Sequence, residues 1–200
     1  STPKGVRFNA DAAERFDGGR GWRDEFSATT LDQTWIMLRA PKETWWKLDG
    51  GKLLVNPRAE PLSGRGNPSF LARRVQNAHF TAATALAVPA ETGVSAGLVV
   101  FQGEKFHYFL AVRREAGGVT AVLERHNRDG LEIVAQQTLG HATQVRLRAS
   151  AADDKITFAI AADAGGWQTL LDGADAKLLT TEVAGGFVGA TVGVHARVDR

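Results

Sequence analysis

Acidic side chains are the first candidates for chemistry in this 200-residue sequence, because a pair of carboxylates can hydrolyse a glycosidic bond. In a β-sandwich that acts this way, the two acids are expected on alternate residues of one strand, so that both face the same groove. No predicted strand has that spacing. The closely spaced acids lie instead in turns or at element edges: Asp24-Glu25, Asp153-Asp154 and Asp172 with Asp175. We interpret them as turn, capping or solvent-exposed acids and predict that the chain alone is not an enzyme.

Metal and nucleophile chemistry have even less support. The five histidines are scattered singly, without the short spacing of a zinc site: His79, His107, His126, His141 and His195. The chain has no cysteine, which excludes disulfides, thiolate metal sites and cysteine nucleophiles. No Gly-x-Ser-x-Gly motif and no glycine-rich phosphate loop opens a helix. We therefore expect no catalytic cofactor, and the compartment stays undecided between secreted or periplasmic and cytoplasmic.

Aromatic side chains point to carbohydrate recognition, because sugars pack their apolar C–H faces on aromatic rings. Trp45 and Trp46 must point to opposite faces if they lie in a strand, so one is expected in the core and the other exposed or at an interface. Tyr108 lies in the segment KFHYFLAV, whose two faces are both partly aromatic. We predict a central strand there, which either lines a sugar groove or fills the core.

The run GRGNPSFLARRVQN combines a loop with a strand that carries two consecutive arginines. Arg73 and Arg74 alternate in direction, so one of them faces inward unless the strand is at a sheet edge. The candidate site in and beside this run comprises Asn67, Phe70, Arg73, Arg74 and Gln76. The alternative interpretation is an edge strand protected by its charges.

The elements that must position these residues are strands. In QVRLRAS and KITFAIA, apolar and polar residues alternate strictly, as expected for half-buried antiparallel strands. The same pattern predicts strands over Phe80–Val88, Gly97–Phe101, Phe106–Arg113, Val119–Arg125 and Val188–Val198. Turn residues such as Asp129-Gly130 separate them. About a dozen strands at roughly ten-residue spacing predict an all-β fold, a two-sheet antiparallel sandwich of the jelly-roll or concanavalin-like type.

Residues 1–21 are interpreted as a lead-in segment with a short helical candidate, Ala10–Arg15, and residues 22–200 as one sandwich domain.

Composition excludes two classes of partner. Lys and Arg total 24 and Asp and Glu total 22, so the formal charge is +2, and 44% of the residues are hydrophobic. Such a balance gives no reason to expect a nucleic acid or an anionic membrane surface as partner. No stretch reaches the roughly 18 apolar residues of a membrane-spanning helix. The sequence is therefore typical of a folded globular domain.

Six ordered segments resemble a known family. They are RDEFSATTLDQTWIMLRAP, GGKLLVN, NPSFLARRVQN, AGLVVFQGEKFHYFLAV, FAIAADAGGWQTL and GGFVGATVGVHA. Together they resemble the C-terminal β-sandwich module of family 43 glycoside hydrolases, the β-xylosidase and α-L-arabinofuranosidase group, over about Trp22 to Val198. This resemblance implies that the chain is an accessory module and that the hydrolytic carboxylates lie in a separate five-bladed propeller, its partner.

The resemblance also implies roles for particular segments. In the family, the loop before the LARR strand helps to close the catalytic pocket, and the matching loop here is Ser63–Ser69. Relatives commonly place an aromatic side chain in this loop, whereas SGRGNPS has none and Phe70 is the nearest. Some modules of this type bind xylan. Many concanavalin-like sandwiches also hold a structural calcium near the chain ends, for which Asp24 and Asp199 are candidate ligands, with surface or capping roles as the alternative.

Four functions stay open at this point. The leading hypothesis is a non-catalytic module of a xylan-degrading hydrolase that completes the catalytic site and binds xylo-oligosaccharides, with Trp45 or Phe70 as stacking platforms. The alternatives are a free-standing lectin-like protein, a domain that only docks to its propeller, and a sandwich hydrolase or lyase. The missing same-strand acid pair argues against the last of these.

Overall fold

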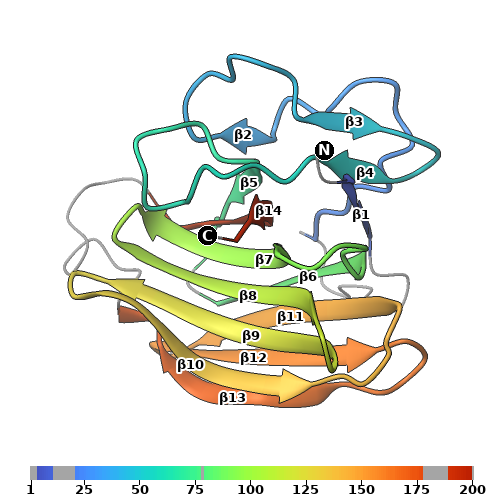
Figure 1. Ribbon diagram of the computed structural model, residues 1–200. Coiled ribbons are helices and arrows are strands. Elements are labelled where there is room, and N and C mark those ends of the chain that lie inside the picture. Colours follow the sequence, from blue (N-terminus) through green and yellow to red (C-terminus); the bar gives the residue numbers. More distant parts are fainter. Residues whose placement is uncertain (1–3, 11–20, 78, 178–188, 200) are drawn as a thin grey trace.

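The computed structural model describes residues 4–10, 21–77, 79–177 and 189–199, and it consists of two stacked antiparallel sheets (Figure 1). Sheet A has the strand order β13-β12-β11-β6-β1-β4-β3 and sheet B the order β10-β9-β8-β7-β14-β5-β2. The strands of sheet A are β1 (Val6–Asn9), β3 (Trp46–Leu48), β4 (Leu53–Val55), β6 (Phe80–Ala87), β11 (Gln144–Ala152), β12 (Lys155–Ala162) and β13 (Gln168–Asp175). Those of sheet B are β2 (Ile36–Met37), β5 (Phe70–Arg74), β7 (Val94–Gly103), β8 (Phe106–Glu115), β9 (Gly118–Asn127), β10 (Gly130–Thr138) and β14 (Thr191–Val198).

This architecture confirms the predicted all-β sandwich. The alternation in β11 and β12 sends Leu147, Phe158 and Ile160 between the sheets, where they are buried. Asp153 and Asp154 form the turn between these two strands, with φ angles of 48° and 63°. No helix in the described ranges is long and apolar enough to cross a membrane.

The start of the chain differs from the sequence interpretation. Strand β1 lies inside the segment taken as a lead-in, yet it pairs with β4 and β6 within sheet A. Phe8, at its centre, is fully buried in the main core. The sandwich therefore includes this part of the lead-in. The helical candidate Ala10–Arg15 falls, apart from Ala10, outside the described residues, as does the predicted strand start at Val188.

Sheet B buries side chains on both of its faces. On the inner face, Tyr108 and Leu110 of β8 join the main core between the sheets. On the outer face, Phe70, Phe101 and Phe109 form a second, smaller core with residues that include Leu62 from the loop before β5. Because both faces are covered, the first seven residues of β8, from Phe106 to Val112, are all buried, and the interior place of β8 in the sheet confirms the prediction made from KFHYFLAV.

Candidate functional site

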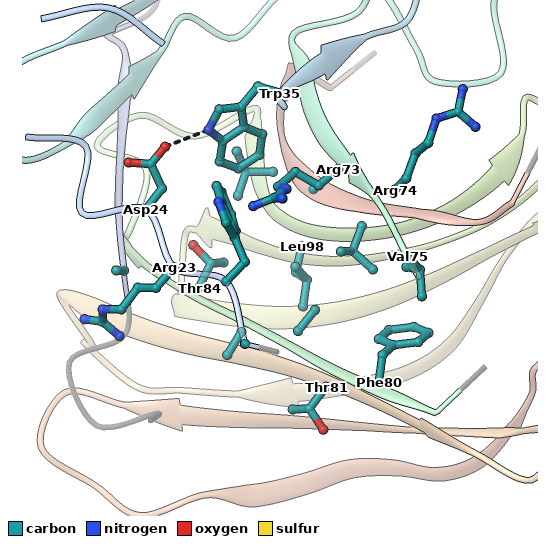
Figure 2. Close-up of a pocket in the computed structure, with 18 of the residues that line it drawn as sticks. Arg23, Asp24, Trp35, Arg73, Arg74, Val75, Phe80, Thr81, Thr84 and Leu98 are labelled. Carbon is teal, nitrogen blue, oxygen red and sulfur yellow. Dashed lines mark hydrogen bonds between the residues drawn. The ribbon is translucent and has the colours of Figure 1, made fainter. Parts of the chain in front are cut away.

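A cleft of about 1070 Å³ opens between the two sheets beside β5 and β6 (Figure 2). The segment around Trp22 and Trp35 forms one wall. Apolar side chains of the sandwich interior form its floor, among them Val75, Phe80 and Leu98. Polar residues at the end of β5 lie along its rim, including Gln76. The cleft is a place where the space between the sheets is accessible from outside.

The most ordered feature of the cleft is a set of aromatic and charged side chains on its wall. The guanidinium of Arg73 lies 3.5 Å from the centroid of the Trp22 ring, a close cation–π contact. Trp22 in turn meets Trp35 edge to face, with ring centroids 5.1 Å apart. Asp24 fixes this wall, because its carboxylate accepts a hydrogen bond from Trp35 Nε1 at 2.8 Å and another from the Phe26 amide at 2.7 Å.

The structure separates the two arginines as the alternation predicted. Arg73 lies on the inner face of β5 and is directed towards Trp35 and Asp24, whereas Arg74 points away from them (Figure 2). Burial lowers the pKa of the Arg73 guanidinium, and the charges of Asp32 and Asp24 oppose this only in part. Arg73 and Gln76 therefore belong to one site, with Arg74 at its edge.

Three of the proposed sugar-contacting side chains lie elsewhere, and their assignment is corrected. Trp45, Phe70 and Tyr108 are each 1% exposed, so none of them can stack on a sugar in this structure. Trp45 is the core member of its pair and Trp46 is half-buried. The prediction had instead named Trp45 as a stacking platform for a sugar. Tyr108 donates its hydroxyl to the Asp175 carbonyl of the opposite sheet at 3.0 Å. All three side chains stabilise the sandwich.

The exposed aromatic ring of the cleft is Trp22, which sequence reasoning did not single out. Its side chain is 40% exposed, the highest value among the large hydrophobic residues that line this cleft. Trp22 lies just after the segment interpreted as a lead-in, so no strand pattern drew attention to it. The available signal was its tryptophan identity in a polar, glycine-rich stretch, GGRGWRDE.

Asn67 has a structural role in the loop Ser63–Ser69. It accepts a hydrogen bond from Trp45 Nε1 at 2.8 Å and donates to the carbonyls of Leu38 and Arg39. Arg39 in turn donates to the carbonyls of Gly64 and Gly66, at 3.3 and 2.8 Å. Both halves of the loop are thus tied to the segment that follows β2.

The tip of this loop presents few side chains to solvent. Ser63 and Arg65 are exposed, whereas Asn67, Pro68 and Ser69 are buried. Arg65 is therefore the long side chain at the exposed tip of the loop. The loop is held by its hydrogen bonds while its tip is free to make contacts.

The two candidate calcium ligands each accept hydrogen bonds from neighbouring groups. The carboxylate of Asp24 already accepts the two hydrogen bonds described above. That of Asp199 accepts hydrogen bonds from Ser95 Oγ at 2.7 Å and Arg197 Nε at 3.1 Å. Over the ranges that the structure describes, no group of three or more His, Cys, Asp or Glu side chains could hold a metal ion. The two aspartates act as hydrogen-bond acceptors.

Three histidines that are distant in sequence gather on the outer face of sheet B. His107 stacks on His126 with ring centroids 5.0 Å apart, and His195 lies next to Phe109 and Phe70. Burial lowers the pKa of His107 to about 4 and that of His195 to about 3. The nearby Arg197 cation acts in the same direction on both rings.

His107 and His195 predict a loss of stability in mild acid. Because their folded-state pKa values lie below the ordinary 6.5, the unfolded chain binds more protons between pH 6.5 and the folded values. Stability is complete above pH 6.5 and falls as pH falls, by about 2 kcal/mol for each ring at pH 5. Urea unfolding at pH 7.5, 6 and 5 measures the effect. A flat profile between pH 7.5 and 5 would contradict the prediction.

The fold and the sites together describe a concanavalin A-like β-sandwich with an open edge and a rigidly held loop. Comparison with known proteins agrees with this. The chain belongs to the family of β-xylosidase C-terminal concanavalin A-like domains, whose model matches residues 23–198. This confirms the resemblance to the C-terminal module of family 43 glycoside hydrolases.

Individual relatives point in the same direction. The chain is 29% identical over 177 residues to a non-reducing end α-L-arabinofuranosidase of Bacteroides ovatus, covering 87% of this chain and 33% of that protein. It is 27% identical to a xylosidase/arabinosidase of Butyrivibrio fibrisolvens, covering 86% and 33%. A GH43_12 structure from a capybara gut metagenome superposes with a TM-score of 0.80 at 28% identity, covering 86% and 34%. The chain thus spans about a third of the length of these relatives.

Proposed function

We propose that this chain is the non-catalytic accessory module of a xylan- or arabinan-degrading glycoside hydrolase, which packs against the catalytic propeller. The observation that carries the proposal is the family match over residues 23–198, together with relatives in which this region is a third of a hydrolase. The loop Ser63–Ser69 is the element best suited to reach the partner. Its backbone is clamped by Arg39, so it can hold a fixed shape at an interface.

At that interface Arg65 would take the place of the aromatic side chain found in relatives. A guanidinium presents several hydrogen-bond donors in one plane, which suits the hydroxyl groups of a sugar at a pocket rim. Arg39 would act indirectly, by keeping the tip in position through the carbonyls of Gly64 and Gly66. The role of the loop is thus to complete the catalytic pocket rather than to perform chemistry.

The module would also bind xylo-oligosaccharides weakly in the cleft. Arg73 and Gln76 line it and offer hydrogen-bonding groups, and Trp22 replaces Trp45 and Phe70 as the aromatic platform. A free-standing lectin is the alternative, and it would need this cleft to bind sugars without any partner. The two functions differ in whether a catalytic module gains activity from the chain.

A chimaera tests the proposal. The whole chain, including β1 with its buried Phe8, would replace the matching third of the Bacteroides ovatus arabinofuranosidase, and hydrolysis of 4-nitrophenyl α-L-arabinofuranoside would be measured. We expect the truncated enzyme to lose most of its kcat/KM and the chimaera to regain it, while the chain alone hydrolyses nothing. Within the chimaera, Arg65→Ala and Arg39→Ala should each raise KM several-fold, whereas Lys47→Ala, exposed on β3, should not. Hydrolysis by the isolated chain, or full activity without any module, would refute the accessory role.

A further inference from the structure

Arg73 is a partly buried cation that has no hydrogen-bonded or ion-paired partner among the residues that the structure describes. It faces the space between the sheets, where ionic groups are costly to leave unpaired. In the described part of the chain, no carboxylate forms an ion pair with it, and its buried Nη1 atom has no hydrogen-bond partner. The Trp22 ring covers one side of the guanidinium without neutralising its charge.

The carboxylates around the cleft are already engaged by other groups. Asp24 accepts hydrogen bonds from Phe26 and Trp35, as described above. Glu25 pairs with Arg23. Asp32 accepts a hydrogen bond from the Thr34 amide at 2.8 Å and another from the Thr34 hydroxyl. Each of these three carboxylates has other hydrogen-bond or ion-pair partners, and none of them is paired directly with Arg73, so the guanidinium can pair with a ligand.

The walls of the cleft also indicate the shape of that ligand. Val75, Phe80 and Leu98 give it an apolar floor, and the half-exposed Trp22 gives it a flat aromatic wall. A flat ring fits between such surfaces, because both an aromatic ring and a pyranose present apolar faces. Gln76, which lines the cleft and is exposed, offers hydrogen bonds to substituents on the ring.

We infer that the cleft binds a carboxylate carried on a six-membered ring, with the carboxylate paired to Arg73 and the ring lying against Trp22. Two sources share this chemistry: a uronic acid sugar and an aromatic acid. The inference deepens the proposed carbohydrate-binding role of the cleft, because it makes an acidic substituent, rather than a neutral xylose chain, the feature that is recognised. It does not depend on docking to a propeller.

Matched ligand pairs test this on the unmodified chain. Glucuronic acid and cinnamic acid would be titrated calorimetrically against their uncharged counterparts, glucuronamide and cinnamamide, with xylohexaose as the neutral sugar chain. At least one acid should bind ten-fold or more tightly than its amide, since charge-assisted hydrogen bonds are the stronger class. Which acid binds distinguishes the sugar source from the aromatic source. Equal binding of acid and amide, or no binding of either acid, overturns the inference.

Variants then locate the site. Arg73→Gln should weaken binding of the preferred acid at least ten-fold, and Trp22→Ala should weaken it several-fold. Arg7→Gln removes an exposed arginine of β1 that does not line the cleft, and it should change the affinity less than two-fold. An unchanged affinity in Arg73→Gln overturns the inference, and if that variant does not fold, the acid and amide comparison still decides. Binding of xylohexaose without preference for acids would support the proposed function while refuting this inference.

Discussion

Trp45→Ala is expected to lower the free energy of unfolding by about 3–5 kcal/mol, the range for removing a large aromatic side chain from a packed core. The Trp45 ring is 1% exposed and meets Trp46 edge to face, with ring centroids 5.1 Å apart. Its Nε1 donates to Asn67 Oδ1, so the substitution also removes a buried hydrogen bond. Urea unfolding followed by circular dichroism measures the change.

Trp22→Ala is the control for this substitution. Trp22 is 40% exposed and lies outside both hydrophobic cores, so its loss should cost about 1 kcal/mol. If Trp45→Ala unfolds at the same urea concentration as the parent chain, the core position of Trp45 is wrong. The expected instability also means that a binding defect in Trp45→Ala would report unfolding, and Trp22 is the informative position for ligand studies.

The alternation of apolar and polar residues predicts that neighbouring side chains point to opposite faces of a strand. It predicts less well whether each face is buried in the core or exposed to solvent. It correctly placed Arg73 and Arg74 on opposite faces of one strand, and Trp45 and Trp46 in different environments. It could not say which tryptophan is in the core, because that depends on how the short strands β3 and β4 join sheet A. Phe70 was misassigned for a related reason, since sheet B is covered on both faces and its outward side chains are buried too. Tyr108 was misassigned because alternation does not show that its face of β8 is the one packed in the core between the sheets.

The histidine cluster shows what a sequence can reveal once pairing is considered. His107 and His126 lie 19 positions apart, which conceals any relation between them when spacing alone is examined. They are equidistant from the Ala116-Gly117 turn, however, and the β8–β9 hairpin places them directly opposite each other. His195 could not be added in this way, because β14 reaches sheet B from a distant part of the chain and pairs with β7 and β5.

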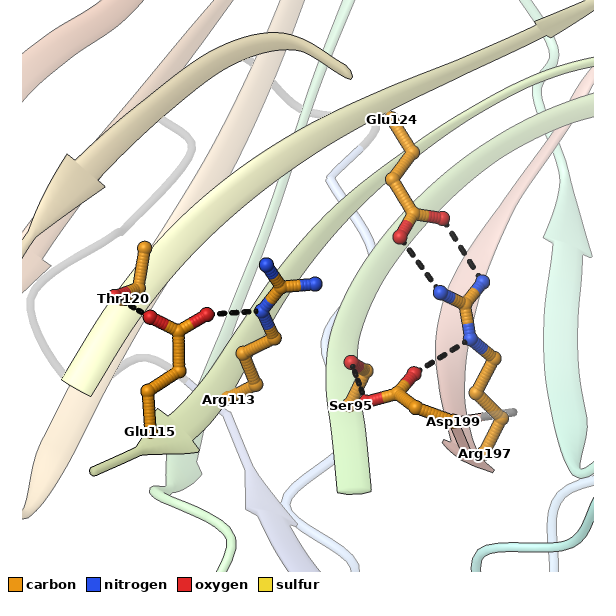
Figure 3. A network of polar contacts seen from close by, with 7 residues as sticks. All are labelled: Ser95, Arg113, Glu115, Thr120, Glu124, Arg197 and Asp199. Carbon is orange, nitrogen blue, oxygen red and sulfur yellow. Dashed lines mark hydrogen bonds and ion pairs between the residues drawn. The ribbon is translucent and has the colours of Figure 1, made fainter. Parts of the chain in front are cut away.

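The ion pair between Glu124 and Arg197 is the second place where a single substitution should have a large effect. Arg197 of β14 donates two hydrogen bonds to Glu124 of β9, at 2.9 and 2.6 Å, across the two strands that lie between them (Figure 3). The side chain of Glu124 is 5% exposed and that of Arg197 is 20% exposed. Burial acts to lower the pKa of Arg197, but Glu124 and Asp199 outweigh it and raise the pKa.

Glu124→Ala should therefore lower the free energy of unfolding by about 3–5 kcal/mol, because it leaves a buried cation with only Asp199 as counter-charge. The ion pair between Glu115 and Arg113 is a matched control, because its two side chains are far more exposed than those of Glu124 and Arg197 (Figure 3). Glu115→Ala should cost less than about 1 kcal/mol. The double variant Glu124→Leu/Arg197→Met should recover much of the stability, because removing both charges removes the unpaired group along with the bond. Urea unfolding of all four proteins at pH 7.5 makes the comparison. Equal losses in Glu124→Ala and Glu115→Ala would mean that burial adds nothing to this ion pair, and that the outer face of sheet B is more open to water than its packing indicates.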